Sequence, residues 1–191
     1  MISLNVKKWI FSLLILIAPI MSLAAIPEWE IISDESSLTF TGVQNGAPIT
    51  GSFKRFDGEI KFDPNQLNRS SVQIFINLAS ISVSFMDIVT TLTSSDWLYT
   101  ALYPEAIFQA DHFIKLCENK YQAKGTLTIR NKTAPVTLLF SAQELSKNKA
   151  RVKGSTTLKR TTFDIGQGEW ADTDTVKDAV EINFTVTAVR R

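Results

Sequence analysis

The chain has 191 residues, of which 45% are hydrophobic and 20% charged, and its formal net charge is +1. This balance, without a polybasic run, gives no indication of nucleic acid or an anionic membrane surface as a partner. The single cysteine, Cys117, excludes an intramolecular disulfide, and we expect it to be a small buried residue.

Residues 1–24 have the organisation of a cleavable secretory signal. Lys7 and Lys8 precede an uncharged apolar stretch at 9–20, which is shorter than the roughly 20 residues needed to span a bilayer. Small residues follow, so we expect cleavage after Ala24 and one domain comprising residues 25–191. Loss of the two lysines leaves this domain with about one net negative charge.

Apolar residues then recur mainly at alternate positions, which is the period of half-buried strands. In chain order, the segments with this pattern are 28–32, 37–44, 56–62, 72–78, 106–115, 121–129, 136–142, 150–159 and 180–188. About eight or nine strands joined by short turns favour an all-β antiparallel barrel over a sandwich. Several inward positions carry small residues, which fit either an open interior or bulges: Gly58, Ala123, Gly125, Ala142 and Gly154.

The segment 85–103 has no sustained period of two. Ser94 or Ser95 can cap a short helix that carries Trp97 and that Pro104 ends. We therefore expect one short helical insertion between strands.

The residue inventory argues against catalysis. One histidine, His112, and one cysteine cannot form the usual zinc sites, and no nucleophile-elbow motif accompanies His112. We expect His112 to be structural or to line a pocket. Paired carboxylates such as Asp172 and Asp174 lie in a segment with the composition of a solvated loop. The sequence therefore predicts a protein that is not an enzyme and that has no catalytic residues, metal or cofactor.

Four ordered motifs resemble those of the YceI-like family. They are residues 51–64 (GSFKRFDGEIKFDP), 92–98 with 103–108, 121–130 with 133–136, and 160–166 (RTTFDIG). Residues 41–48 and 166–172 look like the branch of that family associated with cytochrome b561-type membrane domains. Two departures are Ser36-Ser37, where many members carry His-Ser, and Asn131 in place of a frequent glycine. Asn131 tolerates the left-handed backbone of such a turn.

The resemblance implies a single extended, lipocalin-like, eight-stranded antiparallel barrel that binds a polyisoprenoid or a similar long amphiphile. It also implies a periplasmic location. The cytochrome-associated branch suggests an isoprenoid quinone as the ligand and a cytochrome b561-type membrane protein as a possible partner, for a carrier or buffer that is a monomer or homodimer. The alternative is a barrel with a filled core that acts as an interaction partner of a membrane cytochrome or another envelope protein.

Large apolar residues on the strand faces are the expected lining of the interior, although each is also compatible with ordinary core packing. These are Phe40, Phe53, Phe56, Ile60, Phe108, Leu127, Leu138, Phe140 and Phe184. Trp97 and Trp170 are expected at a barrel rim, where they cover the mouth or plug one end. Arg55, Asp96 and Arg160 are the charged motif residues that can contact a ligand headgroup; for Arg160 a structural ion pair is the other interpretation.

Overall fold

The computed structural model describes residues 25–191, so the expected signal at 1–24 lies outside the described residues. Within that range there are eleven strands, one α-helix and five short 3₁₀ helices. The strands are β1 (Glu28–Ile31), β2 (Ser37–Gln44), β3 (Ala47–Phe53), β4 (Phe56–Lys61), β5 (Ser71–Asn77), β6 (Ile81–Val83), β7 (Glu105–Cys117), β8 (Lys120–Ile129), β9 (Lys132–Ser146), β10 (Lys149–Lys159) and β11 (Ala179–Arg190). The helices are η1 (Ser33–Glu35), η2 (Leu67–Arg69), η3 (Leu78–Ser80), α1 (Met86–Thr93), η4 (Arg160–Phe163) and η5 (Gly168–Trp170).

Eight antiparallel strands form a closed barrel. Their order is β1-β4-β5-β7-β8-β9-β10-β11, and pairing of Trp29 in β1 with Arg190 in β11 closes the ring. The other three strands branch from β11, because β2 pairs with its first half and β3 and β6 follow outward from β2. The predicted class, an eight-stranded antiparallel barrel with one short helical insertion, is confirmed.

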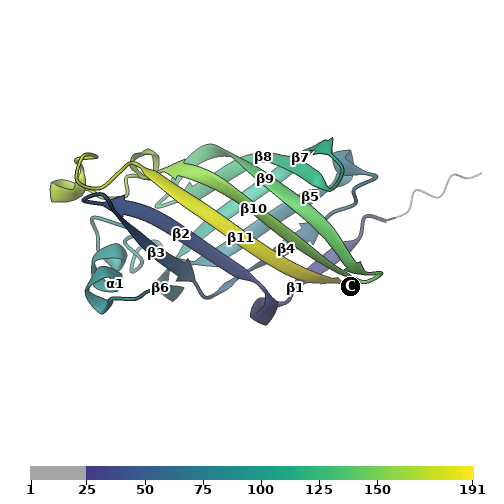
Figure 1. Ribbon diagram of the computed structural model, residues 1–191, viewed down its shortest axis with the longest axis horizontal. Coiled ribbons are helices and arrows are strands. Elements are labelled where there is room, and N and C mark those ends of the chain that lie inside the picture. Colours follow the sequence, from purple (N-terminus) through teal and green to yellow (C-terminus); the bar gives the residue numbers. More distant parts are fainter. Residues whose placement is uncertain (1–24) are drawn as a thin grey trace, which may run out of the picture.

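The barrel is elongated, and its two ends differ (Figure 1). At the helical end lie α1, β6, the β2–β3 hairpin and the loops 94–104 and 164–178. At the opposite end, called here the terminal end, β1 meets the last residues of β11 beside the β7–β8 and β9–β10 turns. All the long strands run between these ends, so their inward side chains form one continuous interior surface.

Alternation along β8 shows how the sequence produces this interior. Tyr121, Ala123, Leu127 and Ile129 are buried, whereas Lys124 between them is exposed. The β8–β9 turn needs two residues with positive φ, and Asn131 has a φ of 58°. The prediction that Asn131 tolerates a left-handed turn is thereby confirmed.

The small inward residues serve different purposes. A Cβ atom at Gly154 would clash with the Phe184 ring and lie 2.5 Å from the Leu139 carbonyl oxygen, so this glycine makes room for an aromatic side chain. Gly125 lies opposite Ala110, next to a bulge in β7. Gly125 therefore fits the interpretation as a bulge, whereas the space beside Gly154 is filled by a ring and is not open.

The position predicted for the helix is wrong. It was expected to begin at Ser94 or Ser95, but α1 spans Met86–Thr93 and ends at Ser94. Backbone carbonyls in the segment of the expected helix accept hydrogen bonds from distant residues. The Asp96 carbonyl accepts from the N–H groups of Gly166 and Gln167, and the Trp97 carbonyl accepts from the Arg130 side chain. Tertiary contacts thus outweigh the local helix signal.

Two strands, β3 and β6, were not predicted. In β3, Pro48 and Gly51 interrupt the alternating pattern, although a proline can lie within an edge strand. β6 has only three residues and pairs only with β3, so a periodic signal cannot develop. Both strands belong to the branch outside the closed ring.

Candidate ligand-binding cavity

A cavity of about 830 Å³ occupies the barrel interior. Its wall is composed mainly of aliphatic and aromatic side chains from the ring strands, from β2 and from α1. This volume is in the upper part of the range of about 300–1,000 Å³ that is typical of small-molecule sites. The question that the sequence left open is thus answered, because the interior is hollow.

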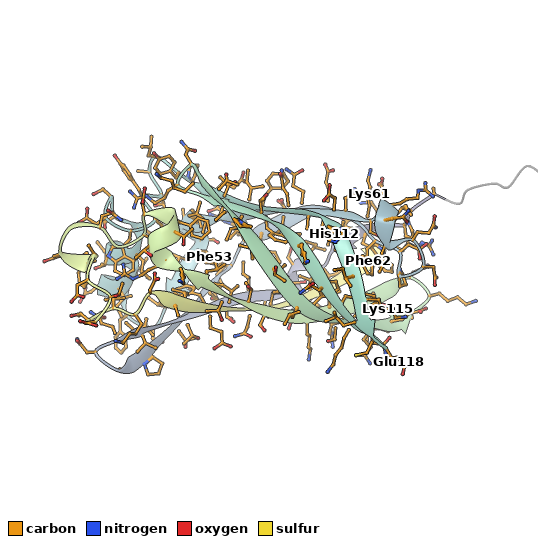
Figure 2. All side chains as sticks on the ribbon, turned by 90° about the horizontal axis from the view of Figure 1, so that it is seen from above. Phe53, Lys61, Phe62, His112, Lys115 and Glu118 are labelled. Atoms are coloured by element: carbon orange, nitrogen blue, oxygen red, sulfur yellow. The ribbon has the colours of Figure 1, made fainter. Side chains whose placement is uncertain are left out.

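All eleven apolar ligand-binding candidates, nine expected on the inner strand faces and two tryptophans expected at a rim, border this cavity. They are Phe40, Phe53, Phe56, Ile60, Trp97, Phe108, Leu127, Leu138, Phe140, Trp170 and Phe184. Seen from above, Phe62 lies nearer the terminal end than Phe53 does (Figure 2), and both residues border the cavity. Strand alternation therefore predicted the nine wall residues that lie on strands, while contact of any of the eleven with a ligand stays a prediction.

Trp97 and Trp170 pack together at the helical end, with their ring centroids 5.7 Å apart. The Arg160 guanidinium lies 5.7 Å from the centroid of the Trp97 ring. Trp97 is buried, and its indole N–H is enclosed without a hydrogen-bond partner among residues 25–191. Because that N–H is enclosed, Trp97 offers a ligand its ring surface and no polar group.

Arg160 is only 2% exposed, and it stabilises the loop 164–178 from inside. Its guanidinium donates to five backbone carbonyls, those of Ile165, Gly166, Asp172, Val176 and Lys177. The prediction of a structural ion pair for Arg160 is wrong, since its partners are backbone carbonyl oxygens and not carboxylates. With its donors occupied, Arg160 has little capacity left for a headgroup.

The other two charged candidates lie outside the cavity lining. Arg55 is exposed between β3 and β4, and Asp96 is half-buried in the loop that follows α1. Asp96 acts through its backbone, because its carbonyl accepts the Gly166 and Gln167 N–H groups at 2.8 and 2.7 Å. The structure therefore does not bring Arg55 and Asp96 to the cavity.

Sequence reasoning missed an aromatic cluster near the terminal end, formed by Phe62, Phe113, Tyr121 and Phe140. The Phe62 ring is edge-on to the other three at centroid distances of 5.5 to 6.2 Å, and Tyr121 stacks on Phe140 at 5.5 Å. All four residues line the cavity. Tyr121 was part of the alternating pattern of β8, but sequence alone does not show that Phe62, which follows β4, meets rings from β7, β8 and β9.

Two single residues differ from expectation. His112 is exposed next to the bulge in β7 and is not part of the cavity wall, so it is not pocket-lining. Cys117 is exposed and not buried, because it lies at the end of β7 beside a second register shift and the β7–β8 turn. Within residues 25–191, no group of three His, Cys, Asp or Glu side chains is placed to hold a metal ion.

The helical end also carries exposed apolar side chains. Phe85, Met86 and Leu102 are more than half exposed, whereas Ile88 and Leu92 of α1 border the cavity. In the described part of the chain, no helix has the length and apolarity required to cross a membrane. The amphipathic α1 therefore contributes to the cavity wall on one side and to the outer surface on the other.

An eight-stranded antiparallel barrel around an apolar interior cavity defines a lipocalin-like architecture. Residues 29–188 match the model of the YceI-like domain, so the chain belongs to the YceI-like family. The resemblance suggested by the four sequence motifs is thereby confirmed.

Among curated proteins, the chain is similar to a UPF0312 protein of Ectopseudomonas mendocina, with 27% identity over 150 residues and 75% of each chain covered. It is also 35% identical over 90 residues to the protein YceI of Escherichia coli, covering 47% of each chain. Among solved structures, BcnA of Burkholderia cenocepacia is 30% identical with a TM-score of 0.78, covering 82% of this chain and 98% of BcnA. A polyisoprenoid binding domain of Saccharophagus degradans has the same fold at 13% identity and a TM-score of 0.69, covering 85% and 98% of the two chains.

Proposed function

We propose that this protein is a periplasmic binding protein that holds a polyisoprenoid, an isoprenoid quinone or a similar long amphiphilic lipid inside its barrel, as a carrier or buffer. The observation that carries the proposal is the apolar cavity of about 830 Å³ that runs within the closed ring of strands. The related fold of a polyisoprenoid binding domain supports the same class of ligand.

The physical basis is the removal of apolar surface from water. A prenyl chain gains about 25 cal/mol for each Å² that it buries. Aromatic and aliphatic walls supply that environment without a chemical step, and an elongated barrel suits a long, narrow ligand. A hollow interior also removes the premise of the alternative function, which required a filled core.

The periplasmic location rests on the export signal expected at residues 1–24, and the quinone on the resemblance of residues 41–48 and 166–172 to the cytochrome b561-associated branch. A b561-type membrane cytochrome is accordingly the proposed partner for exchange of the ligand. The proposal includes no catalytic step.

Ligand extraction tests the proposed function directly. Protein purified from the periplasm under mild conditions is extracted with organic solvent, and the extract is analysed by mass spectrometry. We expect a prenyl lipid or quinone in stoichiometric amount. A protein that emerges lipid-free and then fails to bind any prenyl chain added in detergent-free titrations contradicts the proposal.

A further inference from the structure

The aromatic cluster of Phe62, Phe113, Tyr121 and Phe140 is a built feature of the cavity wall near the terminal end. Phe62 is held in place by its backbone, because its N–H donates to Pro27 and its carbonyl accepts from the Trp29 indole. Four rings fixed in edge-on and stacked arrangements offer planar apolar surfaces, which are suited to another ring rather than to a branched aliphatic chain alone.

Tyr121 adds one polar group to this surface. The residue is only 4% exposed, and its hydroxyl makes no hydrogen bond with any residue from 25 to 191. It differs from the Trp97 indole N–H, which protein atoms enclose completely. Because Tyr121 points inward from β8 and lines the cavity, its accessible hydroxyl faces the ligand space.

Within an apolar cavity wall, a hydroxyl that no protein group pairs with can take its hydrogen-bond partner only from the contents of the cavity. A ligand oxygen is such a partner. The hydroxyl is neutral, so it matches an uncharged acceptor such as a carbonyl. The buried cation of the cavity wall, Arg160, lies at the helical end with its donors occupied, so it does not compete for this group.

We propose that the aromatic cluster is the headgroup site, that it binds a planar quinonoid or aromatic ring, and that the Tyr121 hydroxyl donates a hydrogen bond to an oxygen on that ring. The prenyl tail then extends past Phe108 and Phe53 toward α1. This assignment rests on the proposed function, and it places the headgroup at the end of the barrel opposite to Asp96 and Arg160.

The rim at the same end also carries charged side chains, which suit a different headgroup. Lys147 and Arg190 border the terminal end of the cavity, and neither has an ion-pair or hydrogen-bond partner for its side chain in the described chain. They are exposed, however, and Glu144 lies in the same rim. The observations therefore favour the neutral ring, and a prenyl phosphate becomes an outcome to be tested.

The test compares three probes on delipidated protein: a ubiquinone with two isoprene units, the hydrocarbon squalene, and farnesyl phosphate. Tyr121→Phe removes only the hydroxyl and keeps the ring packed against Phe140. Tyr103→Phe is the matched control, because Tyr103 is outside the cavity wall. We expect Tyr121→Phe to weaken quinone binding about tenfold, the equivalent of one hydrogen bond to a buried acceptor, and to leave squalene binding unchanged. Tyr103→Phe should change neither.

Equal effects of Tyr121→Phe on quinone and squalene, or no effect on either, overturn the headgroup assignment while the proposed function stands. Tighter binding of farnesyl phosphate than of quinone, with loss of that binding in a Lys147→Ala/Arg190→Ala double variant, overturns it in favour of the charged rim. If the wild-type protein binds none of the three probes, both proposals fail.

Discussion

Arg160 is the one charged side chain among the buried residues of the described chain. Burying a cation is tolerated only when its donors are satisfied, and here backbone carbonyls of the loop 164–178 fulfil that role. Gly166 belongs to the same arrangement, because a Cβ atom there would clash with the guanidinium of Arg160. One residue thus fixes a loop that contributes Trp170 and Val176 to the cavity wall.

Replacing Arg160 tests this role at the scale of a single residue. Arg160→Met leaves several buried carbonyls without donors, and we expect the free energy of unfolding to fall by about 3 kcal/mol or more. Urea denaturation followed by tryptophan fluorescence measures the change. Arg55→Met is the matched control, since Arg55 is exposed and should alter stability by less than about 0.5 kcal/mol. Equal stabilities of the two variants would contradict this role.

Individual polar residues were the weakest part of the sequence-based prediction. Arg55, Asp96 and Arg160 were selected because they are charged members of motifs, yet only Arg160 reaches the cavity wall, and it does so with its donors occupied. A motif records that a residue type matters at a position and does not distinguish a ligand contact from a structural one. Tyr121 gave no signal, because a tyrosine on the inward face of a strand has the same pattern as a phenylalanine.

At the scale of elements, strand period was informative because one face of each strand is apolar and the other polar. All nine predicted strands are present, including the weaker segments at 106–115 and 150–159. Strand period was not informative where contacts between residues far apart in the sequence determine the local structure. The turns after α1 depend on Arg130 and on Gly166 and Gln167, which lie more than thirty residues further along the chain.

The connection between η4 and β11 depends on Asp178. Burial by itself raises the pKa of this carboxyl, but the backbone N–H and hydroxyl of Thr161 donate to it, and Lys159 and Arg160 are nearby, so its pKa is lowered from 3.8 overall. A lowered pKa in the folded state means that the charged carboxylate stabilises the fold above about pH 4, and that this contribution is lost as the pH falls below that value.

Asp178→Asn keeps an oxygen that accepts from Thr161 and removes only the charge. We expect it to lower the free energy of unfolding by about 0.5 kcal/mol at pH 7, a small value because the group is partly solvated. The difference from wild type should shrink as the pH falls below 4. Unfolding curves at several pH values measure it, with Asp174→Asn as a control on a carboxylate that accepts no hydrogen bond. A difference that grows on acidification would refute the assigned sign.

At the scale of the whole molecule, the barrel exchanges core packing for an interior space. Side chains that border an empty cavity lack dispersion partners on one side, so the ligand-free protein forgoes part of the stability of a filled core. A ligand that enters the cavity restores those contacts and binds only the folded state. Ligand binding and stability must therefore be linked, and saturation at about 100 times the dissociation constant raises the free energy of unfolding by about 2.7 kcal/mol.

A larger side chain on the cavity wall separates the stability of the ligand-free fold from the stabilisation that ligand binding adds. Ala142 lines the cavity from β9, and Ala142→Phe places a ring in the space that the ligand would occupy. We expect the stability of the ligand-free protein to change by less than about 1 kcal/mol, since the added ring enters empty space instead of a packed core. The increase in thermal midpoint on adding a prenyl quinone should disappear. Ser141→Phe adds the same ring on the outer face, where Ser141 is exposed, and should keep the full increase. If Ala142→Phe retains the wild-type increase, the ligand binds somewhere other than the barrel interior.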